Sequence, residues 1–344
     1  MKTRFNLAVI IAAIALCCSL AGCKKVVLEG LETESDYYTV SLGMAGELVD
    51  VEESPLTRAG EGTDLYGIQV YSAPNKDLPE GTKVTWEKYA YGVFASDKDI
   101  TIKLLKGKKY KFVATMVVDG QNRILYSNGF YQPFTISGTN SGNAKIMTAF
   151  EYQNADYLNG LASGSTFIDG SAWGIYAHAN VERYYGELSD YIPGKGSNKA
   201  LIKMKKVFFG AKFIAKGKLA KEGALEVQMT GAPKMLADLT TNDKKVEDVF
   251  TFSNLKNAYE NNDYTETLAV TLNWHRDDGT VFPLGTHEIT FKRNKMHTVQ
   301  VTIETENSDN QLGIEIEDTD MTDDDDVTNI EDGEVVDTDV DTNA

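Results

Sequence analysis

The chain is poor in cysteine. Its three copies among 344 residues, Cys17, Cys18 and Cys23, all lie near the amino terminus. Disulfides therefore cannot hold the rest of the chain together. Basic residues are too scattered to form the clustered basic face of a nucleic-acid-binding protein, so nucleic acid is not expected as a partner.

Motifs for catalysis and for metal binding are missing as well. The four histidines, His178, His275, His287 and His297, do not have the spacing of a zinc or metalloprotease motif. No serine sits in a G-x-S-x-G elbow, and neither a P-loop nor a dinucleotide-binding glycine pattern occurs. One pair, His287 and His297, could face each other across a hairpin of residues 286–303. The sequence otherwise predicts no enzyme, no cofactor and no metal site, which argues against a secreted hydrolase on a β scaffold.

A lipoprotein signal opens the chain. The stretch "MKTRFNLAVIIAAIALCCSLAGC" begins with Lys2 and Arg4, continues as an apolar run and ends in small residues, which is typical of a secretory signal peptide. Its last four letters match the bacterial lipobox, so residues 1–22 are expected to be removed and Cys23 to be acylated, with palmitate as one chain. Several acyl chains on one residue anchor a protein stably in a membrane. The alternative is an ordinary signal peptide in which Cys23 occurs by chance.

Beyond Cys23, apolar residues recur at every second position, as in strands with one buried face. The clearest runs are "KYKFVATMVV", "ITIKLL", "TLAVTLNW", "TVQVTI" and "LGIEI". Many short strands separated by turn signals predict an all-β protein of tandem β-sandwich domains. We place these domains at residues 36–152 and 160–316, after a linker at 23–35 and before an acidic tail at 317–344.

Turns and a few short helices are expected between the strands. Asp119-Gly120 and Asp278-Gly279 sit between alternating runs, and each pair is favoured in two-residue hairpin turns because both central positions need positive φ. Helices are expected within "DLTTNDKKVEDVF" (238–250) and "FSNLKNAYENN" (252–262).

Negative charge is concentrated at the carboxyl end. Residues 315–344 contain fourteen Asp and Glu and no Lys or Arg. Removing these charges from the formal net charge of −17 leaves −3 for residues 1–314. Neighbouring carboxylates repel one another and favour an extended, solvated chain. The Asp-rich run lacks the glycine and the spaced glutamate of an EF-hand loop, so a built calcium site is not predicted.

Aromatic residues allow two interpretations. Adjacent pairs such as Tyr184 and Tyr185 fit packing within strands, where aromatic side chains are favoured. The alternative is a carbohydrate- or protein-binding surface. A glycan-binding lipoprotein would expose tryptophan or tyrosine platforms, yet Trp86 and Trp274 lie within alternating runs and are expected to be buried. The burial of Trp173, in "GSAWGIYAH", is the least certain of the three.

The stretch "VEESPLTRAG" at 51–60 separates two strand-like runs. Pro55 opposes regular structure there, and Arg58 is a lone basic residue with Glu52 and Glu53 nearby. This segment is either a protease-accessible hinge or an ordinary loop.

Taken together, these features resemble the fimbrillin family, the subunits of type V pili. The resemblance is carried by "LAGC" at 20–23, by "PLTRAGEG" at 55–62 followed by "LYGIQVYS", and by the closing strand "NKMHTVQVTIE". It covers nearly the whole mature chain. It implies paired transthyretin-like β-sandwiches, export as a lipoprotein, and a place at the outer membrane and cell surface, within a fimbria.

The resemblance also implies a mode of assembly and a role in adhesion. In stalk subunits of the family an Arg-specific protease removes the N-terminal segment, which in this chain would mean cleavage between Arg58 and Ala59. The lost strand leaves a groove that a strand of the next subunit fills. The expected partners are other copies of the chain or other fimbrial subunits, with the tail at 317–344 as a candidate donor strand. The position as stalk, tip or anchor stays open, and the alternative is a surface glycan-binding or adhesin lipoprotein that does not polymerise.

Overall fold

The computed structural model describes residues 36–47, 63–76, 79, 81–127, 130–136, 143–152, 158–159, 161–168, 175–194, 198–217, 220–303 and 312–321. Across these ranges the chain is mostly β, with several sheets and two short helices. The expectation of a mostly β fold is confirmed. None of the helices in these ranges has the length and apolar character needed to span a membrane.

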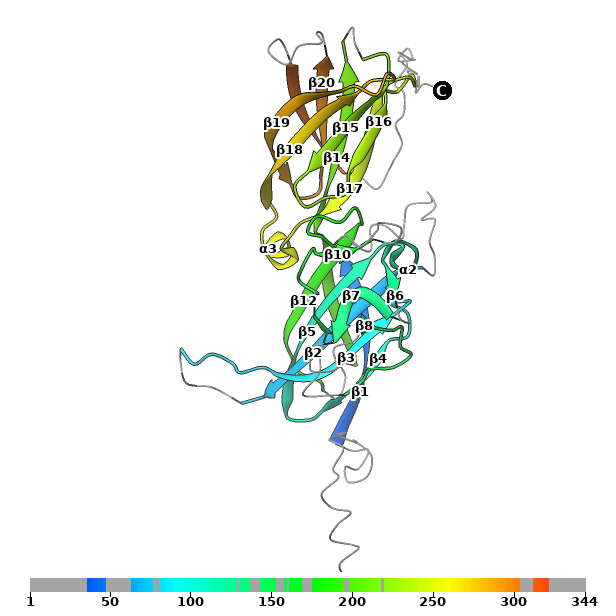
Figure 1. Cartoon of the computed structure of the whole chain (residues 1–344). Helices are drawn as coiled ribbons and strands as arrows, with labels where there is room; N and C mark the ends of the chain where they lie inside the picture. The colour runs from blue at the N-terminus through cyan, green and yellow to red at the C-terminus, as the bar shows by residue number, and fades with distance from the viewer. Residues whose placement is uncertain are drawn as a thin grey trace, which may run out of the picture.

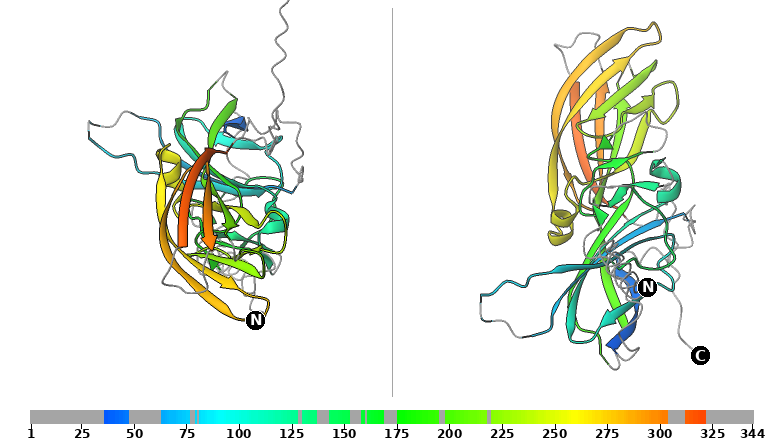
Figure 2. Two further views of the ribbon diagram at one scale, coloured as in Figure 1. Left: turned by 90° about the horizontal axis from the view of Figure 1, so that it is seen from above. Right: turned by 60° about the horizontal axis from the view of Figure 1, so that its bottom comes forward.

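Two stacked lobes make up the described chain (Figure 1). The N-terminal lobe contains β1 (Tyr37–Gly46), β2 (Leu65–Pro74), β3 (Glu87–Phe94), β4 (Thr101–Leu105), β5 (Lys108–Val117), α2 (Gly120–Arg123), β6 (Tyr126–Ser127), β7 (Phe130–Ile136), β8 (Asn143–Ala144), β9 (Leu158–Asn159), β10 (Thr166–Phe167), β11 (Ile175–Tyr176), β12 (Arg183–Tyr191) and β13 (Lys199–Lys206). The C-terminal lobe contains β14 (Phe208–Lys216), β15 (Ala224–Met229), β16 (Met235–Asp238), β17 (Lys245–Thr251), α3 (Leu255–Glu260), β18 (Thr265–His275), β19 (Val281–Lys292), β20 (Lys295–Ile303) and β21 (Leu312–Asp320). Seen from above, the lobes overlap, which shows that they are stacked along one axis (Figure 2).

One large sheet organises the N-terminal lobe. Its seven strands run in the order β3-β2-β5-β12-β13-β1-β4. The sheet encloses a core of its own, because apolar side chains of β1, β4 and β13 belong to the same buried cluster as those of β2, β3 and β5. The opposite faces of β2, β3, β5 and β12 belong to a second cluster, which continues into the C-terminal lobe.

The C-terminal lobe is built from two four-stranded sheets. One has the order β17-β14-β20-β21 and the other β16-β15-β18-β19. Aromatic packing fills the space near the lower end of the lobe, where Phe209 stacks on Phe291 with ring centroids 4.5 Å apart. Offset stacking of this kind stabilises a core beyond the area that it buries.

The alternating runs bury the faces that the sequence predicts. Ten of the predicted inward-facing side chains are at most 8% exposed: Tyr110, Phe112, Ala114, Met116, Ile102, Leu104, Val270, Leu272, Trp274 and Leu268. Two predicted inward-facing residues differ, because Val118 is partly exposed and Ile316 of β21 is 48% exposed. Among the described strands, β21 lies at the edge of its sheet and pairs with β20.

Of the two expected helices, one forms. Helix α3 begins after Asn254, whose side chain accepts a hydrogen bond from the Asn257 backbone amide at 3.0 Å, and it buries Leu255 and Ala258. The helix expected within 238–250 is wrong, because the segment starts at the end of β16, continues through turns and forms strand β17 from Lys245 onward. Its pairing with β14 over seven positions overrides the local preference.

The predicted turns also differ from the structure. Asp119 has a φ of 51°, but the chain then enters α2 instead of a tight hairpin. The reason is tertiary, because the Asp119 amide donates to the Asp64 carboxylate at 2.8 Å and so ties this corner to the start of β2. Asp278 and Gly279 do lie in the connection of the β18–β19 hairpin, but that connection spans residues 276–280.

Sheet membership bears on where the chain divides. Strands β12 and β13 pair with β5 and β1, so residues 183–206 contribute to the sheet of the N-terminal lobe. The sequence predicts a second domain that begins at residue 160, ahead of these two strands. The first strand of the C-terminal lobe is β14, which follows β13 after the single residue Val207.

Candidate functional site: the place of strand β1

The three sequence-predicted site residues, Cys23, Arg58 and Ala59, lie outside the described residues. The strands on either side of the Arg58 segment are described. Strand β1 ends at Gly46 and β2 begins at Leu65. Strand β1 is thus the part of the chain that a cut at Arg58 would separate from the rest.

Strand β1 bridges two other strands of the large sheet. Its first half, from Tyr37 to Ser41, pairs antiparallel with β4. Its second half, from Ser41 to Gly46, pairs parallel with β13. Because β4 follows β1 at the end of the sheet order, removing β1 would leave β4 and β13 facing an empty place.

One face of β1 is part of the core. Val40, Leu42 and Met44 are 0%, 5% and 9% exposed, and they belong to the buried cluster inside the N-terminal sheet. Gly46 has a φ of 87°, and a Cβ at this position would lie 2.7 Å from the Met204 carbonyl oxygen. The strand is therefore held by side-chain burial along one face and by a close backbone approach at its end.

The residue after β1 contacts the other lobe. The Glu47 carboxylate accepts hydrogen bonds from the Arg293 guanidinium, at 2.9 Å for the shortest, and from the Lys206 backbone amide at 2.7 Å. Arg293 lies in the connection between β19 and β20 of the C-terminal lobe. These residues were not singled out from the sequence. Glu47 and Arg293 are 246 positions apart, and no local motif marks either of them.

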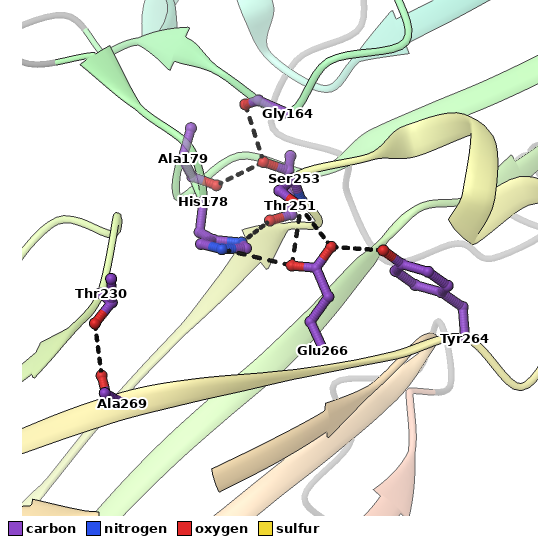
Figure 3. A network of polar contacts seen from close by, with 9 residues as sticks. All are labelled: Gly164, His178, Ala179, Thr230, Thr251, Ser253, Tyr264, Glu266 and Ala269. Carbon is purple, nitrogen blue, oxygen red and sulfur yellow. Dashed lines mark hydrogen bonds and ion pairs between the residues drawn. The ribbon is translucent and has the colours of Figure 1, made fainter. Parts of the chain in front are cut away.

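A second polar network lies where the lobes meet (Figure 3). The Glu266 carboxylate accepts hydrogen bonds from the Ser253 and Tyr264 hydroxyls, both at 2.7 Å. His178 Nε2 lies 3.5 Å from the same carboxylate, and its Nδ1 lies 3.0 Å from the Thr251 carbonyl oxygen. The network therefore contains serine, histidine and glutamate, which are residue types that also occur in catalytic triads.

The geometry of this network is structural. In a triad the serine hydroxyl donates to a histidine, which the carboxylate orients from its other side. Here the carboxylate of Glu266 lies between the two, and the Ser253 hydroxyl donates directly to it. The hydroxyl of Thr251 lies within hydrogen-bonding distance of the Gly164 and Ala179 carbonyl oxygens, which ties the connections before β12 to the end of β17.

The other histidines lie apart from one another. His297 is fully buried, with Nδ1 2.7 Å from Asp318 and Nε2 accepting from the Lys292 amide at 2.8 Å. His287 lies on β19, in the other sheet of the lobe, so the idea that His287 and His297 face each other across a hairpin is wrong. Among the described residues, no group of three or more histidine, cysteine, aspartate or glutamate side chains could hold a metal ion.

The N-terminal lobe also has a cavity of about 340 Å³. It is lined by residues of β2, β5 and β12, by Trp86 ahead of β3 and by the segment around β9: Tyr71, Trp86, Lys111, Val113, Leu158, Leu161, Ala162, Tyr185 and Glu187. Trp86 is half-buried, so the expectation of a buried side chain is met only in part. Trp274 is 1% exposed, as expected, and Trp173 lies outside the described residues.

Charges in the cavity are paired. Glu187 binds the Lys111 ammonium at 2.7 Å and accepts a hydrogen bond from the Tyr185 hydroxyl at 2.6 Å. Burial alone would raise the pKa of Glu187, but the hydrogen bonds from Lys111 and Tyr185 outweigh it and lower the pKa below its ordinary value. The pKa of Tyr185 is raised, first by burial and then by the Glu187 charge. The cavity thus offers aromatic rings beside a neutralised ion pair.

No protein-family model matches the chain, and no curated protein matches it. Solved structures do match it. The chain is structurally similar to fimbrial proteins and candidate adhesins of the Bacteroidales.

Three of these structures illustrate the similarity. A candidate cell adhesion protein from Bacteroides uniformis has 11% identity and a TM-score of 0.38, covering 83% of this chain and 99% of that one. The tip fimbrial protein from Porphyromonas gingivalis, with a C-terminal truncation, has 10% identity and a TM-score of 0.32, at the same coverage. The fimbrial anchor protein from the same organism has 10% identity and a TM-score of 0.31, covering 77% of this chain and 90% of that one. At such identities, a function for this chain has to be argued from its own residues.

Proposed function

We propose that this chain is a structural subunit of a cell-surface fimbria, made as a lipoprotein with its acyl chains on Cys23 and assembled by strand exchange. Its role is structural and adhesive, without catalysis. Each lobe serves as one transthyretin-like β-sandwich domain. The observation that carries the proposal is the position of β1, which precedes Arg58 in sequence and bridges β4 and β13 in the sheet.

Physical chemistry connects this position to assembly. Cleavage after Arg58 would leave β1 bound only by noncovalent contacts. Its departure would expose unpaired backbone groups on Thr101–Leu105 and on Lys199–Met204. It would also expose the apolar side chains against which Val40, Leu42 and Met44 pack. A strand from another subunit restores both the hydrogen bonds and the burial, which is the driving force for β-augmentation.

The partners are other copies of this chain or other fimbrial subunits, and the acidic tail is the candidate donor. Strand β21 runs to Asp320 and pairs with β20, so we take residues 322–344 as the candidate donor. Until β1 is released, it competes with any incoming strand from within the same chain. A short flexible link gives such a competitor an effective concentration of about the millimolar order.

N-terminal sequencing of protein sheared from the cell surface tests the cleavage step. We expect mature subunits to begin at Ala59 and to lack the lipid. In gels run without boiling, wild type should give a series of polymer bands, and the variant Arg58→Ala should give lipidated monomers. The variant Cys23→Ala should no longer incorporate labelled palmitate. Polymerised wild-type protein that still begins at Cys23 would contradict the cleavage model and favour an anchor or accessory role.

Deleting residues 322–344 tests the donor. The deletion spares β21, so folding should be unaffected, and cleaved monomers should accumulate if the tail is the donor. Ladders of normal length from this variant would show that another strand fills the place of β1.

The cavity favours a second candidate function, a surface lipoprotein that binds neutral glycans. Its volume of about 340 Å³ is in the lower part of the range for small-ligand pockets. Trp86 and Tyr71 present aromatic rings, and the paired Lys111 and Glu187 present polar atoms without net charge. A panel of neutral oligosaccharides, measured by calorimetry against wild type and Trp86→Ala, tests this role. Tyr126→Ala, which removes a 54% exposed aromatic elsewhere, is the matched control.

A further inference from the structure

The Glu47–Arg293 pair links β1 to a residue that stays behind when β1 leaves. Glu47 precedes Arg58, so cleavage there removes it with β1. Arg293 belongs to the C-terminal lobe and has a 6% exposed side chain. Both of its terminal nitrogens contact the Glu47 carboxylate, Nη1 at 2.9 and 3.2 Å and Nη2 at 3.2 Å. A two-pronged contact of this kind fixes orientation as well as adding energy.

In the described part of the chain, the carboxylate that lies near Arg293 besides Glu47 is bound to another cation. Arg293 Nη1 also donates to the Lys206 carbonyl oxygen at 2.8 Å, and its Nε is buried without a partner in the described part of the chain. Of the nearby acidic groups, Asp263 is bound to Lys292 at 2.7 Å. Lys206 contributes to this site through its backbone, since its amide donates to Glu47 and its carbonyl oxygen accepts from Arg293. The Glu47 side chain is 30% exposed, so the buried member of the pair is Arg293. Removing Glu47 is unfavourable because the buried Arg293 charge is then left uncompensated.

We propose that Arg293 is a carboxylate-binding position that selects and registers whichever strand occupies the place of β1. In the uncleaved chain Glu47 fills this position. In the assembled fimbria an acidic residue of the C-terminal tail (322–344) of a second copy fills it. The inference rests on the proposed strand exchange and adds to it a requirement for a carboxylate at one end of the incoming strand.

Charge and pattern both favour the tail as the occupant. Residues 322–344 carry ten Asp and Glu side chains and no basic residue, so the tail offers what Arg293 lacks once β1 is gone. Within it, Val336, Thr338 and Val340 alternate directly after Glu334. That spacing places two valines on one face of an extended strand. Strand β1 also combines an apolar face with a carboxylate at one end, but there the buried Val40, Leu42 and Met44 come before Glu47. The tail presents these features in the reverse order, so it would run opposite to β1.

Strand-exchange measurements on the mature chain test the role of Arg293. A site for a sequence-specific protease replaces the residues around Arg58, and after cutting, fluorescent peptides compete with the bound β1. The β1 peptide of residues 36–48 should bind roughly 30-fold or more tightly than its Glu47→Gln form, as expected for truncating one partner of a buried charge pair. Asp36→Asn removes the same charge at the other end of the strand and should change the affinity only slightly. Equal affinities of the wild-type and Glu47→Gln peptides would overturn the proposal.

A tail peptide of residues 329–344 tests the occupant. It should displace β1. Its affinity should fall when Glu331, Asp332 and Glu334 become amides, and should fall less when Asp337, Asp339 and Asp341 do. In the Arg293→Lys chain, which keeps the charge but loses the two-pronged contact, the advantage of carboxylate peptides over amide peptides should shrink. Failure of the tail peptide to compete, or equal losses from the two sets of amides, would overturn the assignment of the tail.

Release of β1 separates this inference from the proposed function. The rate of β1 loss after cutting is measured in rising urea, in wild type and in Glu47→Gln. Faster loss from the variant supports the role of Arg293 even if subunits never polymerise, and identical rates contradict it even if they do. Polymer ladders on cells, which depend on strand exchange as a whole, report on the proposed function alone.

Discussion

Strands β1 and β14 occupy equivalent places in the two lobes. Each is the first strand of its lobe, with a parallel neighbour on one side and an antiparallel neighbour on the other. The neighbours are β13 and β4 for β1, and β20 and β17 for β14. The two strands nevertheless differ in how completely they are held.

The difference appears first in the hydrogen-bonded ladders. In β1 the ladder with β4 ends at Ser41, where the ladder with β13 begins, and past it the Leu42 amide donates to the Ile100 carbonyl oxygen. In β14 every residue from Gly210 to Ile214 is paired on both sides. Removing β14 would therefore leave more backbone groups without partners than removing β1, at a higher free-energy cost.

The two strands also differ in how many of their side chains are buried. Strand β14 buries residues on both of its faces, including Phe208, Phe209 and Phe213. Strand β1 buries aliphatic side chains on one face, and the residues between them are partly or largely exposed. The same topology thus produces one strand, β14, that is buried on both faces, and one strand, β1, that is held by fewer backbone pairs and by one buried face. The weaker binding of β1 is what the proposed cleavage at Arg58 and release of this strand would require.

The largest expected effect is on the integral strand. Phe213→Ala in β14 should lower the free energy of unfolding by about 3–5 kcal/mol, because it leaves a cavity in a fully buried cluster. Urea unfolding of the mature chain measures this loss. The rate at which β1 leaves a chain cut at Arg58 should change little, because Phe213 and β1 lie in different buried clusters. A marked acceleration of β1 release by Phe213→Ala would break the distinction between the two strands.

Next comes the apolar face of β1. Leu42→Ala should destabilise the uncut chain by about 2–4 kcal/mol, as for other buried leucines. In the cut chain the same change should speed the release of β1, since the lost contacts hold only this strand. Thr39→Ala changes an exposed residue of the same strand and serves as the control. If Leu42→Ala destabilises the chain but leaves the release rate unchanged, β1 is not bound through its apolar face.

The sequence predicts the individual strands better than it predicts how they are arranged in sheets. Alternation along "KYKFVATMVV" and "TLAVTLNW" identified buried faces because the period of two is a local property. Membership of β12 in the N-terminal sheet depends on pairing with β5, about 70 positions earlier, and nothing local indicates it. The same holds for the site. The Arg58 segment was visible from its composition, whereas Glu47 and Arg293 meet only through the fold.

A smaller effect is expected at the end of β1. Glu47→Gln should lower the free energy of unfolding by about 1–3 kcal/mol, because the uncharged amide leaves the buried Arg293 guanidinium without its counter-charge. Asp263→Asn, which removes an exposed carboxylate near the same arginine, should change stability little. Urea unfolding of the uncut chain measures both variants. Equal effects of the two substitutions would mean that Arg293 responds to the general field and not to one specific carboxylate.

The smallest expected effect concerns acid and the sheet that holds β1. Against the effect of burial, the hydrogen bonds from Lys111 and Tyr185 lower the folded-state pKa of Glu187 on β12 below its ordinary value, so the Glu187 carboxylate contributes stability that is fully present above that ordinary value. This contribution is lost as the pH falls through the lower, folded-state pKa. Wild type should therefore lose stability between about pH 5 and pH 3, and Glu187→Gln should lose about 1 kcal/mol less over that interval. Urea midpoints at a series of pH values measure the difference, with Glu247→Gln on β17 as a control for a more exposed ion pair. If both variants reduce the loss of stability at low pH equally, acid acts on the two lobes alike. In that case pH cannot be used to weaken selectively the sheet that contains β1.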